Sequence, residues 1–244
     1  MKYLLIIFIL LSDHVFSQSW KDLKKAANKI KKEVKNTSKK VSLFSEKDAA
    51  AAIKQSLGKG VKKGVQILSI KDGFFKNPRV KIPFPPEAKS IFDKLKKLGL
   101  QKELNKVVES LNRAAEDATK SAKPIFINAI KGMTINNAIN IVKGNETAGT
   151  DYLYGSTSSK LLNTFKPNIK TSLNKVDATK HWKVVMTAYN KIPFIKKINP
   201  DLELYVTQKT IEGLFHILSE EEKDIRKNPQ KRTTEILKKV FGNN

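Results

Sequence analysis

Apolar residues recur every three or four positions along most of the chain, the spacing of an amphipathic α-helix with one buried face. The stretch SEKD from Ser45 has the spacing of a helix-capping box, and Ile53, Leu57, Val61 and Val65 follow it. Further helices are expected to begin at Glu87, Gln101, Pro124, Thr134, Thr147 or Thr150, Asp177, Asp201 and Pro229. No run alternates between apolar and polar residues, so we expect an all-α fold of eight to ten helices in a single compact domain.

Glycine and proline interrupt two of these patterns. Gly58, Gly60 and Gly64 lie inside the first helical stretch, where glycine indicates either close approach of another helix or a kink. Pro167 lies within the stretch that begins near Thr150, and we expect it to kink or interrupt that helix.

The first residues have the pattern of a secretory signal peptide. Lys2 precedes the nine-residue apolar run Tyr3 to Leu11, and the small residues Val15 and Ser17 follow. This run is less than half of the roughly 20 residues that span a bilayer. We therefore expect residues 1–17 to be a signal peptide, and the protein to be exported, to the periplasm in a bacterium with two membranes.

Residues 18–44 predict a basic amphipathic helix followed by a polar linker, and residues 45–244 the helical domain. The basic helix has two interpretations that the sequence leaves equal: it binds a membrane surface, or its apolar face packs on its own domain. The residues expected at a membrane surface are Trp20, Lys21, Lys24, Lys25, Lys31 and Lys32.

The formal net charge of +24 concerns partners more than fold. It favours an anionic envelope component, such as lipid headgroups or an acidic glycan, or a partner protein. Export makes nucleic acid an unexpected partner. The chain has no cysteine, which leaves no disulfide, thiol nucleophile or thiolate metal site.

The segment DGFFKNPRVKIPFPP, Asp72 to Pro86, joins two helical stretches, and we call it the strap. Its prolines and the residues before them favour extended backbone, so a rigid extended segment is expected. Packing is the favoured role for its phenylalanines, and ligand contact is the other. The candidate binding residues here and elsewhere are Phe74, Phe75, Lys76, Arg79, Lys81, Phe84, Arg113, Tyr152 and Tyr205.

The acidic residues cluster at ion-pair spacing on two expected helices. Arg113 and Glu116 are three residues apart, and Glu222 and Arg226 are four apart. Solvated ion pairs are the favoured interpretation, and Glu116 and Glu220 are the carboxylates that an enzyme would use. The histidines lack partners at metal-ligand spacing, and the common phosphate-binding, hydrolase and metalloprotease motifs are absent from the sequence, so neither a metal nor a cofactor is expected.

Several motifs together resemble one bacterial family. The strap, then LNRAAEDATKSAKPIFINAIKGMTINNAINIVKG, TDYLYGSTSSKL, YVTQKTIEGLFHILSEEEKDIRKNP and RTTEILKKVFG, are similar to the domain of unknown function 4197, over about Ser45 to Gly242. The resemblance implies an exported, mostly helical envelope protein and brings no established activity. The family pattern often has aspartate where this chain has Asn128 and Asn137.

These observations favour a non-catalytic protein that binds an anionic envelope component or a partner protein through a basic helical surface. The alternative is an envelope hydrolase or transferase that uses carboxylates on its helices.

Overall fold

The computed structural model describes residues 44–175, 177–191 and 201–242, without the side chains of Glu87 and Ile91. The chain divides into two compact units, Met1–Ser45 and Glu46–Asn244. Because the described residues begin at 44, the expected signal peptide and basic helix lie outside them. The second unit is the one described below.

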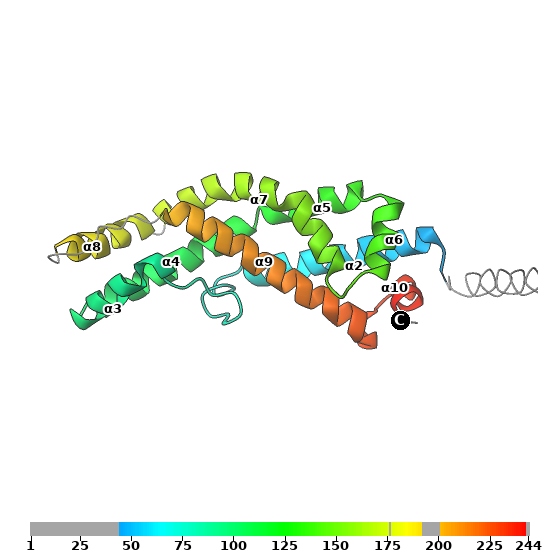
Figure 1. Ribbon diagram of the computed structural model, residues 1–244, viewed down its shortest axis with the longest axis horizontal. Coiled ribbons are helices and arrows are strands. Elements are labelled where there is room, and N and C mark those ends of the chain that lie inside the picture. Colours follow the sequence, from blue (N-terminus) through cyan, green and yellow to red (C-terminus); the bar gives the residue numbers. More distant parts are fainter. Residues whose placement is uncertain (1–43, 176, 192–200, 243–244) are drawn as a thin grey trace, which may run out of the picture. The chain divides into compact units, whose positions relative to one another are not determined.

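Nine α-helices and two short 3₁₀ helices make up the described part of this unit, and no strand occurs among the described residues (Figure 1). The expected all-α fold is confirmed. The α-helices are α2 (Glu46–Leu68), α3 (Lys89–Lys97), α4 (Gln101–Thr119), α5 (Ala122–Gly132), α6 (Ile135–Lys143), α7 (Ala148–Lys175), α8 (Ala178–Asn190), α9 (Leu202–Lys227) and α10 (Glu235–Phe241). The 3₁₀ helices are η1 (Pro86–Ala88) and η2 (Pro229–Lys231).

The two longest helices, α7 and α9, pack against each other and connect the two ends of the unit (Figure 1). At one end, α2 packs against α5, α6, α9 and α10. At the other end, α4 packs against α3, α7, α8 and α9. The strap leaves α2 and leads to α3, so it lies where the two halves of the bundle meet.

Local sequence sets some of the helix ends. The Thr134 side chain accepts a hydrogen bond from the Asn137 N–H, and Asn137 bonds back to the Thr134 backbone, which completes a capping box at α6. Asp201 Oδ1 accepts from the Leu204 N–H at 2.9 Å and so caps α9 as expected. Gly99 has a φ of +81°, a left-handed conformation that suits glycine and turns the chain from α3 into α4.

Pro167 was expected to kink or interrupt its helix, and the expected interruption does not occur. The helix α7 continues through it from Ala148 to Lys175. Leu161, Phe165 and Ile169 are fully buried at helical spacing around it. Their packing keeps the segment helical, because tertiary burial outweighs the local cost of one missing hydrogen bond.

Two of the three glycines in α2 mark close contact with α9, as one of the two sequence interpretations predicted. A Cβ at Gly64 would lie 3.4 Å from Leu218 Cδ2, and a Cβ at Gly60 would lie 3.7 Å from Glu221 Cβ. Gly58 has open space around it and takes no part in this contact.

The Glu222–Arg226 pair forms as the spacing predicted, but it is buried, so the interpretation as a solvated pair is wrong. Glu222 is 4% exposed and accepts from the N–H groups of Gly149 at 2.9 Å and Thr150 at 2.7 Å. N–H groups in the first turn of a helix have no acceptor within the helix itself, and this end of the helix carries partial positive charge. Arg226 donates to Glu222 Oε1 and, at 2.8 Å, to the Ile141 carbonyl. One carboxylate on α9 therefore fixes the start of α7.

We expect Glu222→Gln to lower the free energy of unfolding by about 3 kcal/mol, because it removes one partner of a buried ion pair. An amide also presents a donor to N–H groups that need an acceptor. Denaturant unfolding followed by circular dichroism measures the change. The control is Glu212→Gln, whose carboxylate pairs with Lys209 on the exposed surface of the same helix. Equal stability of the two variants would show that Glu222 does not fix α7.

Candidate ligand-binding groove

The strap consists of turns in its first half and extended backbone in its second half. The Lys76 N–H donates to the Asp72 carbonyl at 3.2 Å, and the Lys81 N–H donates to the Asn77 carbonyl at 2.8 Å. The expectation of an extended segment throughout is therefore wrong for residues 72–80. Asp72 has a φ of +72°, and a Cβ at Gly73 would lie 2.4 Å from the Ile67 carbonyl, so this pair makes a reversal too tight for a larger residue.

Helix α4 holds the strap through a buried acid. Glu116 is 4% exposed, and its Oε1 accepts from the N–H groups of Phe74 at 3.1 Å and Phe75 at 3.2 Å. Arg113 donates to Glu116 Oε2 at 2.9 Å and to Asp72 Oδ1 at 2.7 Å. The Arg113–Glu116 pair predicted by spacing is thus formed, and it binds the strap instead of facing solvent.

A second contact on α4 is an amide that pairs with the strap backbone. Asn112 is fully buried, its Oδ1 accepts from the Ile82 N–H at 2.8 Å, and its Nδ2 donates to the Ile82 carbonyl at 2.8 Å. The side chain thus satisfies both backbone groups of a buried residue in a segment that has no regular secondary structure to do so.

Helix α9 contacts the strap from the other side. Arg79 pairs with Glu220 at 2.5 Å, and the Tyr205 hydroxyl donates to the Pro83 carbonyl at 3.1 Å. The Phe74 ring packs against Gly213, where a Cβ would lie 2.9 Å from Phe74 Cε1. The strap is therefore fixed between α4 and α9.

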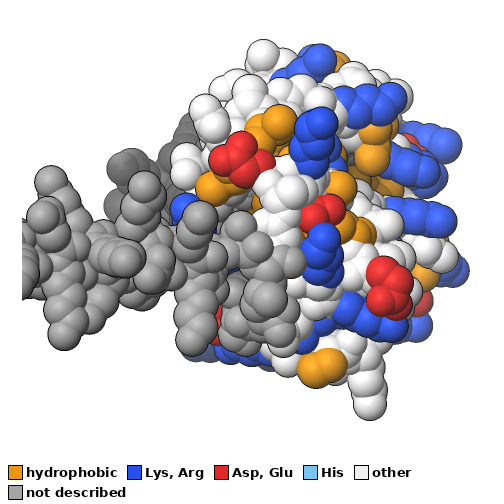
Figure 2. Space-filling model, turned by 90° about the vertical axis from the view of Figure 1, so that its right-hand side faces the viewer, with side chains coloured by type: hydrophobic (Ala, Val, Ile, Leu, Met, Phe, Trp, Pro, Cys, Tyr) orange, Lys and Arg blue, Asp and Glu red, His pale blue; other side chains and the backbone are white. Residues whose placement is uncertain are grey.

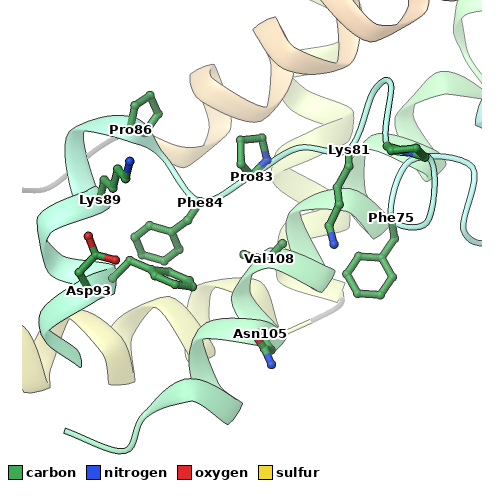
Figure 3. A pocket seen from close by; sticks show the side chains of 11 residues that line it. Phe75, Lys81, Pro83, Phe84, Pro86, Lys89, Asp93, Asn105 and Val108 are labelled. Atoms are coloured by element: carbon green, nitrogen blue, oxygen red, sulfur yellow. The ribbon is translucent and has the colours of Figure 1, made fainter. Parts of the chain in front are cut away.

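An open groove of about 980 Å³ lies along the extended half of the strap (Figure 3). Its lining is mostly apolar, with strap residues on one side and α3 and α4 on the other. It is lined by Phe75, Pro78, Lys81, Pro83, Phe84, Pro86, Lys89, Phe92, Asp93, Asn105 and Val108. Lys81 Nζ lies 4.7 Å from the centroid of the Phe75 ring, close enough for a cation–π interaction.

The aromatic part of the groove rests on the core of this end of the bundle. The Phe84 and Phe92 rings are 5.3 Å apart, edge to face, and Phe84 lies 5.4 Å from Trp182 of α8. Phe84 is 9% exposed and Trp182 7%. The groove wall is therefore a preformed surface backed by packed side chains.

The structure brings only some of the predicted binding residues to the groove. Phe75, Lys81 and Phe84 line it, and Phe74 is fully buried, so its ring cannot meet a ligand. The other predicted binding residues take part in structural contacts or lie elsewhere. Lys76 pairs with Asp72, Arg79 with Glu220, Arg113 with three acids, Tyr205 bonds to the strap, and Tyr152 lines a separate depression beside α6.

Sequence reasoning missed Lys89, Phe92, Asn105 and Val108 as groove residues. Val107 is buried in the core, whereas its neighbour Val108 is half-buried and lines the groove. The helical pattern assigned a face to each of these residues. It could not show that the strap crosses that face.

The two alternative catalytic carboxylates, Glu116 and Glu220, do not share a pocket. Both bind the strap, Glu116 from α4 and Glu220 from α9, and Glu220 also lies 3.3 Å from His216 Nε2. Across the described ranges, no three side chains of the histidine, cysteine, aspartate and glutamate types gather as metal ligands.

Lysines concentrate at the same end of the unit as the groove. We call this region the lysine lobe: α3, residues 101–106 of α4, and α8 with the residue after it. Its lysines are all exposed: Lys89, Lys94, Lys96, Lys97, Lys102, Lys106, Lys180, Lys183 and Lys191. None of them forms an ion pair with a carboxylate of the described residues, and the only acids among the lobe's own residues are Asp93 and Glu103.

The fold and groove define an all-α protein with an open apolar groove beside a basic surface. The family model for a protein of unknown function (DUF4197) matches residues 43–242, and the chain belongs to this family. Comparisons with curated proteins and with solved structures found no match. Asn137, one of the two positions where the family resemblance led us to expect aspartate in other members, completes the capping box of α6.

We expect Asn112→Ala to lower the free energy of unfolding by about 3 kcal/mol, because the buried N–H and carbonyl of Ile82 lose their partners. The control on the same helix is Asn105→Ala, whose exposed amide contacts Gln101 and whose loss is expected to cost less than about 0.5 kcal/mol. Denaturant unfolding measures both variants. Similar values for the two would mean that Asn112 does not anchor the strap.

The strap also predicts a dependence of stability on pH. The hydrogen bond from Arg113, followed by that from Lys76, lowers the pKa of Asp72 below its ordinary value. A carboxyl with a lowered folded-state pKa stabilises the fold above its unfolded pKa of about 3.9, and the contribution is lost as the pH falls through the folded value.

Asp72→Asn removes this charge and keeps a residue type that tolerates positive φ. The stability difference between wild type and Asp72→Asn is therefore expected to be present at neutral pH and to shrink below about pH 3.9. Thermal unfolding across this pH range measures it. A difference that stays constant into acid would contradict the ion pair's contribution.

Proposed function

We propose that the protein is an exported, non-catalytic envelope protein that binds an anionic envelope component through the lysine lobe. The observation that carries this proposal is the set of exposed lysines on α3, α4 and α8 that form no ion pair with any acid in the part of the chain that the structure describes. Export is inferred from the N-terminal residue pattern and places the lobe among envelope components.

Ion pairs among the described residues lie outside the lobe and include several at the opposite end of the unit. Figure 2 shows the opposite end, near α6 and α10, where acidic side chains lie among the lysines and arginines. Pairs there include Lys239 with Asp48 at 2.7 Å and Lys227 with Glu146 at 2.8 Å. Paired charges cancel at a distance, whereas unpaired lysines attract anions over roughly a Debye length of 8–10 Å. The lobe is thus the surface best suited to an anionic partner.

Exposed apolar side chains favour a lipid surface over an acidic glycan. Leu98, at the end of α3, is 63% exposed, and Val184, on α8, is 47% exposed. Lysines combined with exposed apolar side chains suit the headgroup region of an anionic membrane, where each lysine contributes about 1 kcal/mol. Among the helices in the described ranges, none has both the length and the hydropathy of a membrane span. Binding at the surface of the bilayer, through lipid headgroups, is the mode we propose.

The hydrolase or transferase alternative gains no support from the geometry. Glu116 and Glu220, the carboxylates it would use, contact opposite sides of the strap and face different partners.

The test compares two variants with the same net charge. In one, the lobe lysines Lys94, Lys96, Lys97 and Lys102 are replaced by glutamine. In the other, four exposed lysines outside the lobe, none with an ion pair among the described residues, are replaced in the same way: Lys62, Lys123, Lys143 and Lys160. The N-terminal basic segment remains in both chains, so its contribution is equal.

We expect the lobe variant to bind phosphatidylglycerol vesicles at least about tenfold more weakly than wild type, and the other variant to lose much less. Flotation measures binding, and zwitterionic vesicles and raised ionic strength are expected to abolish it. Equal losses in the two variants, or binding that ignores vesicle charge, would falsify the proposal.

A further inference from the structure

We infer that the groove beside the strap binds a single-chain anionic amphiphile, with its alkyl chain along the aromatic wall and its anionic head at Lys81. This inference rests on the proposed function in one respect: the lysine lobe brings the groove to the lipid that would supply such a ligand. It goes further by giving the site and the chemistry of the ligand.

The apolar lining of the groove suits an alkyl chain. The groove runs from Phe75 past Val108 to Phe84 and Pro86, with Asn105 as its uncharged polar side chain (Figure 3). Its volume of about 980 Å³ is at the upper end of the range for small-molecule sites. Prolines on one side and packed rings on the other keep this lining in place without a ligand. Preformed walls reduce the ordering cost that binding would otherwise carry.

The charged residues of the groove place the anionic head at one end. Lys89 shares its end of the groove with Asp93, an acid four residues along α3, so an anionic head there would also meet a carboxylate. Lys81 comes from the strap, lies beside Phe75 at the other end, and has no ion pair with a described carboxylate (Figure 3). It is therefore the cation that an anionic head can neutralise.

The neighbouring cation cannot take this role. The Arg113 guanidinium lies 5.1 Å from the Phe75 ring centroid, but it already donates to Asp72, Glu109 and Glu116. Both cations lie over the Phe75 ring, so Arg113 and Lys81 together help to hold this ring in its orientation. Arg113 fixes the strap and the ring, and Lys81 remains for the ligand.

The position of the groove connects it with membrane binding. Lys89, Phe92 and Asp93 belong to α3 and Asn105 to α4, both of which also carry the lysine lobe. A lobe bound to anionic headgroups therefore places this end of the unit at the lipid surface. An amphiphile that leaves the bilayer would find an apolar site with a cation next to it.

Isothermal titration calorimetry of the full chain, with ligands below their micelle concentrations, tests the inference. The probes are decanoate, laurate and myristate, with lauroyl lysophosphatidic acid as the phosphate-bearing source and dodecyltrimethylammonium as the cationic counterpart. We expect one site for each anion, affinity that rises about fourfold per added methylene while the chain fits, and weaker binding of the cation. Tighter binding of the lysophosphatidic acid than of laurate would assign the ligand to phospholipids, and the reverse order to fatty acids.

Two variants probe the two parts of the groove. Lys81→Gln is expected to weaken laurate binding about tenfold, as the loss of a charged hydrogen bond does. Val108→Trp fills the groove from a half-buried position and is expected to abolish laurate binding. The controls are Lys62→Gln and Ile135→Trp, at an exposed lysine and an exposed apolar residue on other helices. Circular dichroism confirms that each variant folds.

Absence of laurate binding, or laurate binding that Val108→Trp leaves unchanged, overturns the inference. Binding of the cation as tight as that of laurate overturns the anionic preference. These failures are separable from failure of the proposed function, because Val108→Trp keeps the lobe lysines and is expected to float with anionic vesicles as wild type does. If the vesicle test fails while laurate binds in the groove, the groove stands and the membrane-binding proposal falls.

Discussion

The structure depends on one buried carboxylate, Glu116, and on the guanidinium of Arg113 that accompanies it. Together they join the first turn of the strap to α4: Glu116 accepts from the backbone N–H groups of Phe74 and Phe75, and Arg113 donates to the Asp72 carboxylate. A buried acid without partners costs several kcal/mol. Here the partners of the acid belong to a segment that lacks the regular backbone hydrogen bonds of a helix or a sheet. The strap and α4 therefore satisfy each other, and the groove exists because the strap is fixed at that distance from the helix.

A second buried acid, Glu222, fixes another segment to the bundle in the same way. Glu222 on α9 accepts from two N–H groups at the start of α7, as Glu116 accepts from two N–H groups of the strap. In both cases an arginine three or four residues along the same helix completes the carboxylate's bonds. In a chain with a formal net charge of +24, these acids join irregular or terminal segments to the bundle, while many lysines remain on the surface. The protein therefore combines a specific fold, stabilised by buried acids, with an excess of positive charge on its surface.

The groove and the lysine lobe share helices, so binding and stability are linked through the strap. Phe84 contributes one face to the groove and another to the packing with Trp182, and Lys81 follows directly after Val80, which packs near Gly213 of α9. A ligand in the groove would contact residues whose backbone is already held by Asn112 and Tyr205. Little reorganisation is required on binding, which is the condition under which modest apolar contact gives useful affinity.

The sequence by itself determined the all-α class, the helices, the starts of two of them at Thr134 and Asp201, and the pairs Arg113–Glu116 and Glu222–Arg226, because helical periodicity and capping are local properties. Only the tertiary structure decided that those pairs are buried, that α7 continues through Pro167, that Phe74 belongs to the core, and that Val108, Phe92 and Lys81 face a common groove. These outcomes depend on which segment crosses which helix face. Spacing along the chain carries no information about that crossing, since contacts such as Phe74 to Glu116 join residues far apart in sequence.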